Sequence, residues 1–226
     1  MKRGENGMSI VNEILGEVIS EASGALAGGV INHVLTLNGY HKYTWPDGAH
    51  YEGEWRDNDR HGRGKYSTPD GVCYEGEWRD NKRHGRGKCT WPDGGYYEGE
   101  WHDSKCHGRG KYTSPDGSCY EGDYHDHKCH GKGKYTRIDG MCYEGDYHDN
   151  KWHGRGKYTS PDGSCYEGEF RDSKRHGIGK LTYANGNVLE GSWEYGQFQG
   201  RGKFIYRDGK TREGLWENNN LVRWLT

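Results

Sequence analysis

The residues in this sequence with the most chemical potential are histidines that recur at a fixed interval. Six of them occupy one repeated position: His61, His84, His107, His130, His153 and His176. A second series has the same interval: His102, His125 and His148. Imidazoles bind transition metals and change protonation near neutral pH. The two histidine series therefore suggest two kinds of chemistry, metal binding and pH sensing.

The spacing of the series argues against a metal site. If each repeat is a β-hairpin, equivalent residues of successive repeats lie two strands apart, at about 9.6 Å. One ion cannot then take two ligands from the same series. The two series, with the adjacent pairs Cys106-His107 and Cys129-His130, make a zinc site conceivable, but no spacing matches a closed zinc module. We expect no metal and no cofactor, and we expect the first series to order loops through hydrogen bonds.

Seven cysteines, an odd number, point away from a disulfide framework. Four of them hold one repeat position: Cys73, Cys119, Cys142 and Cys165. The interval excludes disulfides within that series, because bonded cysteines need Cα atoms within about 7 Å. No secretory signal is evident at the N-terminus, which favours a reducing, cytoplasmic compartment. No nucleotide-binding loop or nucleophile–base signature occurs. We therefore expect no catalytic residues and no enzymatic activity.

All these positions belong to one internal repeat. Its period is 23 residues, the difference between the equivalent positions Tyr51 and Tyr74 (74 − 51). The segment Tyr51-Glu52-Gly53-Glu54-Trp55 recurs from residues 74, 97, 120, 143 and 166. A seventh unit starts at 189, a partial unit starts at 212, and a half repeat occupies 38–50. The sequence thus predicts an N-terminal segment over 1–37, a repeat array over 38–220 and a C-terminal tail over 221–226. Contacts in such arrays run between neighbouring repeats.

Each repeat contains two segments with the period of a β-strand. In Tyr51–Trp55 the aromatic residues and the glycine share one face, and the glutamates share the other. In Gly62–Tyr66 the glycines and the tyrosine lie opposite Arg63 and Lys65. A polar loop over 56–61 joins the segments, and Pro69-Asp70-Gly71 turns into the next unit. We predict an all-β fold, an elongated single-layer antiparallel sheet of tandem β-hairpins, with a short N-terminal helical segment.

The aromatic residues form a ladder along one face of that sheet. Its members are Tyr51, Trp55, Tyr74, Trp78, Tyr97, Trp101, Tyr120, Tyr124, Tyr143 and Tyr147. The central glycine of each segment leaves bare backbone on which a ring can lie flat. The rings either pack only on one another and on glycine, or bind a partner. Because a single layer cannot bury both faces, we expect some rings to remain accessible as a binding surface.

The charges of the chain are nearly balanced. The formal net charge is −2, from 32 basic and 34 acidic side chains, which gives no pull toward nucleic acid. Lys82, Arg83, Arg86 and Lys88 cluster in one hairpin, and similar groups repeat. A stacked basic edge could contact acidic lipid headgroups, at about 1 kcal/mol per residue. Neighbouring aspartates neutralise part of it, so we do not favour membrane contact.

The two ends of the array differ from its middle. Apolar residues at helical spacing, from Ile10 to Ile19, predict an N-terminal helix. This helix either caps the first hairpin or docks a partner. Leu221, Val222 and Trp224 cap the last strand or enter a partner. Unpaired end strands invite association, so a homodimer through the array ends or the helix is a further alternative.

The repeated pattern, Tyr-Glu-Gly-Glu-Trp followed by His-Gly-x-Gly, resembles the MORN (membrane occupation and recognition nexus) repeat over about residues 38–220. The resemblance implies twisted rows of hairpins that act as protein-binding scaffolds, as in radial-spoke heads of cilia and protist cytoskeletal scaffolds. The family usually has glycine three residues after the tryptophan. This chain has Asn58, Asn81, Ser104, His127, Asn150 and Ser173 there. A left-handed backbone at this position suits asparagine and histidine better than serine.

These observations favour a non-enzymatic scaffold or adaptor. We expect it to bind a peptide or helix of partner proteins along the aromatic face. The resemblance implies a cytoplasmic setting in a cytoskeletal, axonemal or ciliary assembly. The alternative is a membrane-tethering module that binds anionic phospholipids through its basic hairpin loops.

Overall fold

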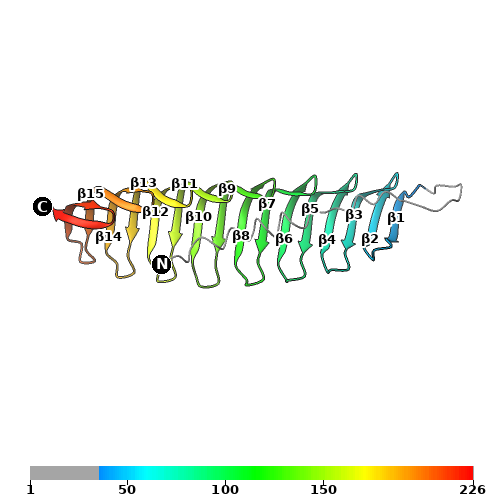
Figure 1. Cartoon of the computed structure of the whole chain (residues 1–226), viewed down its shortest axis with the longest axis horizontal. Coiled ribbons are helices and arrows are strands. Elements are labelled where there is room, and N and C mark those ends of the chain that lie inside the picture. The colour runs from blue at the N-terminus through cyan, green and yellow to red at the C-terminus, as the bar shows by residue number, and fades with distance from the viewer. Residues whose placement is uncertain (1–35, 226) are drawn as a thin grey trace. The chain divides into compact units, whose positions relative to one another are not determined.

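The computed structural model describes residues 36–225, which contain seventeen strands and no helix (Figure 1). The all-β class and the open antiparallel sheet are therefore confirmed. No helix in this range could cross a membrane. The helix predicted near residues 10–19 lies outside the described residues.

The described chain divides into two compact units. The first runs to Pro115 and includes Tyr124–Lys128, and the second comprises Asp116–Asp123 and the residues from Cys129 onward. Strands wholly in the first unit are β1 (Gly39–Thr44), β2 (His50–Arg56), β3 (Asp59–Ser67), β4 (Cys73–Arg79), β5 (Lys82–Thr90), β6 (Tyr96–His102) and β7 (Lys105–Thr113). Each of these strands pairs antiparallel with the next, as Figure 1 shows.

The second unit repeats the arrangement. Its strands are β10 (Cys142–His148), β11 (Lys151–Thr159), β12 (Cys165–Arg171), β13 (Lys174–Thr182), β14 (Val188–Glu194), β15 (Gln197–Ile205), β16 (Thr211–Glu217) and β17 (Asn220–Trp224). Residues of β8 (Cys119–His125) and β9 (Lys128–Thr136) fall in both units. Strands β10 to β17 again pair antiparallel in chain order. Residues 221–224, expected to form a tail, belong to β17 and pair with β16.

The first turn of each hairpin is shorter than the sequence suggested. The loop predicted over 56–61 is wrong, because β2 continues to Arg56 and β3 begins at Asp59. Asp57 and Asn58 connect them with φ of 51° and 71°, which makes a type I′ turn. The left-handed backbone predicted three residues after the tryptophan position is confirmed at all six non-glycine residues, with φ between 62° and 71°.

The second turn agrees with the Pro-Asp-Gly prediction. The backbone N–H of Thr68 donates to the Val72 carbonyl at 2.9 Å, and that of Gly71 donates to Thr68 at 3.0 Å. Gly71 has a φ of +95°, which favours glycine. In the next repeat, the Asp93 carboxylate accepts from the N–H of Gly95 at 2.8 Å. The aspartate side chain therefore stabilises the turn by a hydrogen bond to a backbone N–H of that same turn.

The tyrosine of each repeat lies flat on glycine. Tyr51 is fully buried. A Cβ atom added to Gly64 would lie 2.2 Å from the Tyr51 hydroxyl oxygen, so only glycine leaves room for this ring. The hydroxyl donates to the Glu54 carbonyl at 3.0 Å. The predicted role of the strand glycines is confirmed.

Rings of successive repeats interlock edge to face. The Tyr74 ring centre lies 5.0 Å from Trp78 of its own repeat and 5.3 Å from Trp101 of the next. Such T-shaped pairs add about 0.5–1.5 kcal/mol beyond their burial. The indole N–H of Trp78 donates to the Gly64 carbonyl at 3.1 Å. The core of each unit is thus a continuous row of aromatic rings on one side of its strands.

The opposite face carries charged residues. Lys157 pairs with Glu167 at 2.8 Å and Lys65 with Glu75 at 3.9 Å, with all four side chains more than half exposed. Exposed pairs contribute about 0–1 kcal/mol each, so they support register more than stability. The second glutamate of each segment has another role. Glu77 accepts from the backbone N–H of Arg86 at 2.9 Å, where a bulge shifts the β4–β5 register.

Candidate functional site

The ten rings predicted to bind a partner are all buried. Their exposed fractions lie between 0% and 7%, so the expectation that some of them remain accessible is wrong. The physical reason is that each ring packs against glycine backbone and against the rings of the next repeat, so a single-layer sheet can bury its own rings. Binding by these ten residues stays a prediction, and the structure places them in the core.

Other rings on the same face are only half buried. They include Tyr43 and Tyr66 in the first unit, and Trp152, Tyr158 and Phe204 in the second. Most come from the second strand of a hairpin. Tyr66 lies directly opposite Tyr74 in the β3–β4 register, and Tyr158 opposite Tyr166 in β11–β12, so they share the aromatic face. Their exposure was missed from the sequence, where the signal for Tyr66, Tyr158 and Phe204 was an aromatic residue two positions after the second strand glycine.

Arginines lie among these rings. The Arg60 guanidinium is 4.4 Å from the Trp78 ring centre and 5.0 Å from Tyr66. Arg175 sits 5.0 Å from both Tyr166 and Trp193, and burial lowers its pKa. A cation over an aromatic face contributes about 0.5–2 kcal/mol, and more as it is desolvated. The aromatic face therefore presents half-buried rings together with arginine.

The four basic residues predicted to form a lipid-binding edge do not converge. Arg83 lies on the aromatic face, 4.7 Å from the Trp101 ring centre. Lys82 is 3.8 Å from Asp103. Arg86 and Lys88 lie opposite glutamates in the β5–β6 register, and the Lys88 ammonium is 4.4 Å from the Tyr96 ring centre. These positive charges are distributed over two faces and are largely matched.

The two histidine series interleave. In the first unit, ring centres are 5.3 Å apart for His84 and His102, 5.8 Å for His102 and His107, and 5.0 Å for His107 and His125. In the second unit, His148 lies 5.0 Å from His130 and 5.8 Å from His153. Histidines of the first series are still far from one another, but a histidine of the second series lies between each of these pairs, as His102 does between His84 and His107.

The expected loop hydrogen bonds from the first histidine series are not what holds the turns. The Nδ1 atoms of His61, His84 and His107 are buried and have no hydrogen-bond partner among the described residues. In His84 it is the backbone carbonyl that makes a hydrogen bond, since it accepts from the Tyr74 hydroxyl at 3.5 Å. Burial, with the nearby Arg79 and His102, lowers the pKa of His84. The neutral form of its imidazole is therefore favoured.

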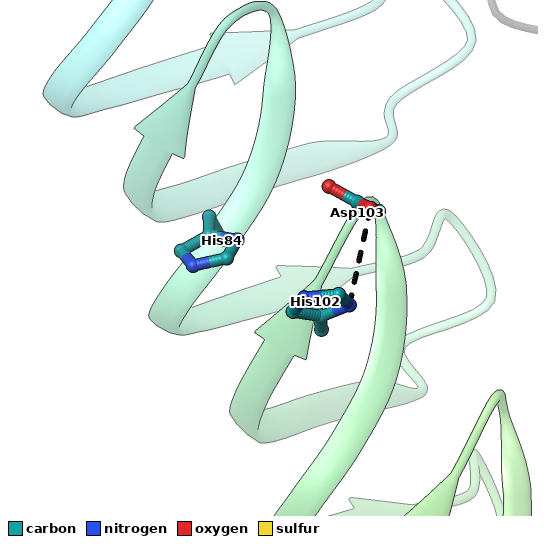
Figure 2. Close-up of side chains that lie close together, drawn as sticks. All are labelled: His84, His102 and Asp103. Atoms are coloured by element: carbon teal, nitrogen blue, oxygen red, sulfur yellow. Dashed lines mark ion pairs between the residues drawn. The ribbon is translucent and has the colours of Figure 1, made fainter.

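An aspartate completes two histidine pairs, as Figure 2 shows for one of them. The Asp103 carboxylate has one oxygen 3.9 Å from His102 Nδ1 and the other 3.8 Å from Lys82. The Asp126 carboxylate likewise lies 3.7 Å from His107 Nδ1 and 3.1 Å from Lys105. The lysine hydrogen bond is the main reason that the pKa of Asp126 is lowered.

The side chain that follows each type I′ aspartate binds the preceding repeat. Asn81 Oδ1 accepts from the backbone N–H of Arg60 at 2.9 Å, and Asn150 Oδ1 accepts from that of Cys129 at 2.7 Å. His127 uses Nδ1 for the same bond to Cys106, at 3.3 Å. Burial lowers the pKa of His127 to about 4, so the ring accepts as the neutral form. The positions that depart from the usual glycine are thus structural.

The seven cysteines are free thiols. Cys106 lies opposite Trp101 in the β6–β7 register, which places it on the aromatic face. His107 follows it in the same strand, so its ring lies on the other face. The adjacent Cys-His pairs therefore do not form joint ligand sets, and the described residues offer no nucleophile–base arrangement from these pairs.

Comparisons with known proteins give similar solved structures and a family match. Among solved structures, the chain is similar to the SAS-4 (dCPAP) TCP domain of Drosophila melanogaster, in complex with a proline-rich motif of Ana2 (dSTIL). The identity is 13%, over 85% of this chain and 97% of that one, with a TM-score of 0.45. The TCP10 domain of Danio rerio CPAP gives 16% identity over 81% and 98%, with a TM-score of 0.37. A CPAP G-box domain gives 17% identity over 79% and 100%, with a TM-score of 0.45.

A search of curated proteins gives no significant match. The MORN repeat family model matches residues 38–50, 51–73, 74–96, 97–119, 120–142, 143–165, 166–188 and 190–211. These eight consecutive matches cover most of the chain and contain the Tyr-on-glycine packing, the type I′ turns and the interlocked rings described above. The chain belongs to the MORN repeat family.

Proposed function

We propose that this MORN repeat protein is a non-enzymatic scaffold that binds partner proteins along its aromatic face. The observation that carries the proposal is the set of half-buried rings on that face, with Tyr66 and Tyr158 as its representatives in the two units. Fully buried rings lie directly beside them in the strand register, as Tyr51 and Tyr74 do beside Tyr66. Binding energy in protein interfaces concentrates in tyrosine, tryptophan and arginine.

Rigidity lowers the cost of binding to such a surface. The Tyr51 hydroxyl is hydrogen-bonded and its ring is fixed between Gly64 and the neighbouring tryptophans. A side chain that is already ordered loses little conformational entropy when a partner arrives. Tyr66, at the surface of this packing, can therefore contact a peptide or helix without rearrangement of the sheet.

The opposite face is a poorer binding surface. Its lysines and glutamates already pair with one another across strands, as in Lys65 with Glu75 and Lys157 with Glu167. A partner would have to break these pairs and desolvate both charges. No observation favours the membrane-tethering alternative, because Lys82, Arg83, Arg86 and Lys88 do not gather at one edge.

The proposal is tested by capture of partners from a lysate of the source cell on the immobilised full chain. Tyr66→Ser with Tyr158→Ser removes two half-buried rings. The matched control is Lys65→Ser with Lys157→Ser, since these neighbours in the same strands face the other way. We expect the tyrosine variant to lose captured partners by about tenfold or more, and the lysine variant to retain them.

Circular dichroism and thermal unfolding show whether both variants keep the wild-type fold. Equal capture by wild type and the tyrosine variant, or loss only in the lysine variant, would contradict binding through the aromatic face. Mass spectrometry then identifies the captured proteins, and a scaffold is expected to retain them in stoichiometric amounts.

A cytoplasmic, cytoskeletal or ciliary setting is supported by the family resemblance alone and is part of the proposal. Detergent extraction of the source cell separates the cytoskeleton from soluble and membrane proteins. We expect the tagged protein to remain with the extracted cytoskeleton or cilia. Recovery with membranes, lost at high salt, would instead favour an electrostatic membrane contact.

A further inference from the structure

Two clusters in the first unit place the ligand types of a transition-metal site together. One cluster consists of His84, His102 and Asp103, and the other of His107, His125 and Asp126. In each, one nitrogen of either imidazole and one carboxylate oxygen lie within 4.8 Å of one another. Figure 2 shows how His84 from β5 and His102 and Asp103 from β6 and its turn meet. We propose that each cluster binds a divalent transition-metal ion, with Zn²⁺ as the representative.

The ligand atoms need only a small closure. In a tetrahedral zinc site with bonds of about 2.0–2.1 Å, neighbouring ligand atoms lie roughly 3.3 Å apart. The His102 and Asp103 side chains are 56% and 47% exposed, so rotation about their side-chain bonds can bring them together without disturbing the core. Two imidazoles and one carboxylate leave a fourth position for water. Such an open, exposed site exchanges its metal readily.

The half-buried histidine of each cluster is suited to anchor the metal. The Nδ1 atoms of His84 and His107 are buried and have no hydrogen-bond partner among the described residues. A buried polar nitrogen without a partner costs about 1–3 kcal/mol. A metal ion that takes either imidazole nitrogen fixes the ring orientation and its tautomer. The His84 nitrogen is therefore unmatched, and that of His107 faces the Asp126 carboxylate of its own cluster at 3.7 Å.

The aspartates divide their two oxygens between a lysine and a histidine. In the first cluster, Lys82 lies near Oδ1 of Asp103, and Oδ2 faces His102. In the second, Lys105 lies near Oδ2 of Asp126, and Oδ1 faces His107. One oxygen of each carboxylate therefore remains directed at the imidazoles. The lysine would not bind the metal itself but would orient the carboxylate that does.

Spacings along the chain do not reveal this site, because they match no closed zinc module. The ligands come from consecutive strands, and the β5–β6 pairing brings His84 close to His102 and Asp103 although they are distant in sequence. Thiols take no part, because Cys106 and Cys129 are buried and Cys106 lies on the aromatic face. Imidazole and carboxylate ligands without thiolate suit Zn²⁺, Ni²⁺ and Cu²⁺.

The chain contains its own comparison. His61 has Arg79 where the two clusters have a second histidine, and His153 has Arg171 there. Arginine stays protonated and cannot ligate a metal. His102→Arg with His125→Arg therefore removes one ligand from each cluster, while it installs a residue that the same repeat position already accommodates. His61→Gln is the control, since His61 belongs to neither cluster.

The test measures Zn²⁺ bound to the metal-stripped full chain at micromolar free Zn²⁺, by equilibrium dialysis and by calorimetry. We expect wild type and His61→Gln to bind about two more equivalents than the double variant, with all three unfolding at similar temperatures. The Co²⁺-loaded wild type is expected to show ligand-field bands without a thiolate charge-transfer band. Equal Zn²⁺ binding by wild type and the double variant, or a strong thiolate band, would overturn the proposal.

Discussion

Asn81 accepts a hydrogen bond from the backbone N–H of Arg60, one repeat earlier, through its Oδ1 at 2.9 Å. The N–H of Asn81 itself donates to the Arg60 carbonyl at 3.1 Å. A single turn residue is therefore joined to the preceding hairpin through both its backbone and its side chain. The left-handed conformation of Asn81, with φ of 65°, directs both groups toward that hairpin.

Substitutions at Asn81 separate the side-chain bond from the backbone preference. Asn81→Gly keeps the left-handed turn, as Gly196 does naturally in its own repeat, and removes the side-chain bonds to Arg60 and Asp59. We expect the free energy of unfolding to fall by about 0.5–1.5 kcal/mol. Asn81→Ala adds the cost of a left-handed Cβ and should lose about 1 kcal/mol more. Urea unfolding measures both, and equal stability of wild type and the glycine variant would show that the side-chain bonds of Asn81 contribute nothing.

His127 makes the stability of the first unit depend on pH. Its pKa is lowered from an ordinary value of 6.5 to about 4 because the ring is buried. The unfolded chain takes up a proton near pH 6.5 and the folded chain only near pH 4. The stability from neutral His127 is therefore fully present above pH 6.5 and is lost as the pH falls toward 4. After allowance for partial solvent exposure, the loss is on the order of 1–2 kcal/mol.

His127→Asn isolates this effect, since asparagine fills the same position at Asn81 and Asn150. The variant should unfold at a nearly pH-independent offset from wild type above pH 6.5. Between pH 6.5 and 4, wild type should lose stability faster than the variant does. Thermal unfolding over this range provides the measurement, and parallel curves for the two proteins would exclude His127 as the titrating group.

Gly64 tests the packing of tyrosine on glycine. A Cβ atom there would lie 2.2 Å from the Tyr51 hydroxyl oxygen and 2.4 Å from its ring carbon Cζ. Both belong to a fully buried ring, so we expect Gly64→Ala to lower the free energy of unfolding by about 3 kcal/mol. Gly94→Ala is the control, because Gly94 has open space around it and a φ of +91°. Backbone strain alone should cost it about 1 kcal/mol. Similar losses in the two variants would contradict a steric role for Gly64.

Much of the fold could be predicted from the repeat itself. The period, the strand faces and the left-handed position follow from local chemistry, because Tyr-Glu-Gly-Glu-Trp alternates and Asn58 tolerates a positive φ. The turn length could not be inferred as easily. Asp57 is left-handed as well as Asn58, and only the pair together makes a two-residue type I′ turn. The sequence suggested a longer loop there, over 56–61.

The candidate sites were harder to predict because they depend on contacts between repeats. Tyr74 is buried by Trp101 of the next repeat, so a count of rings on one face overstated how many stay accessible. His84 meets His102 because the β5–β6 pairing brings together residues whose separation matches no known motif. Register within a hairpin is encoded locally, whereas side-chain proximity across hairpins depends on the bulges and turns of both.

Thiol labelling reports the difference between the cysteine positions. Cys73, Cys119, Cys142 and Cys165 are half buried, whereas Cys89, Cys106 and Cys129 are 0–2% exposed. Burial also raises the pKa of the Cys89 thiol, which lowers its reactive thiolate fraction. We expect four thiols to react readily with a chromogenic disulfide in the native protein, and the other three only after denaturation. Rapid reaction of all seven would show that the aromatic core opens.

The central claim, that partners bind on the aromatic face, is tested most directly by site-specific photocross-linking. A photoreactive phenylalanine analogue is placed at Tyr66 in one protein and at the neighbouring Lys65 in another, so that the two probes lie on opposite faces of β3. Both proteins are irradiated in a lysate of the source cell after their fold is verified. The account predicts a specific partner cross-link from position 66 and none above background from position 65. A cross-link from position 65 alone would contradict it.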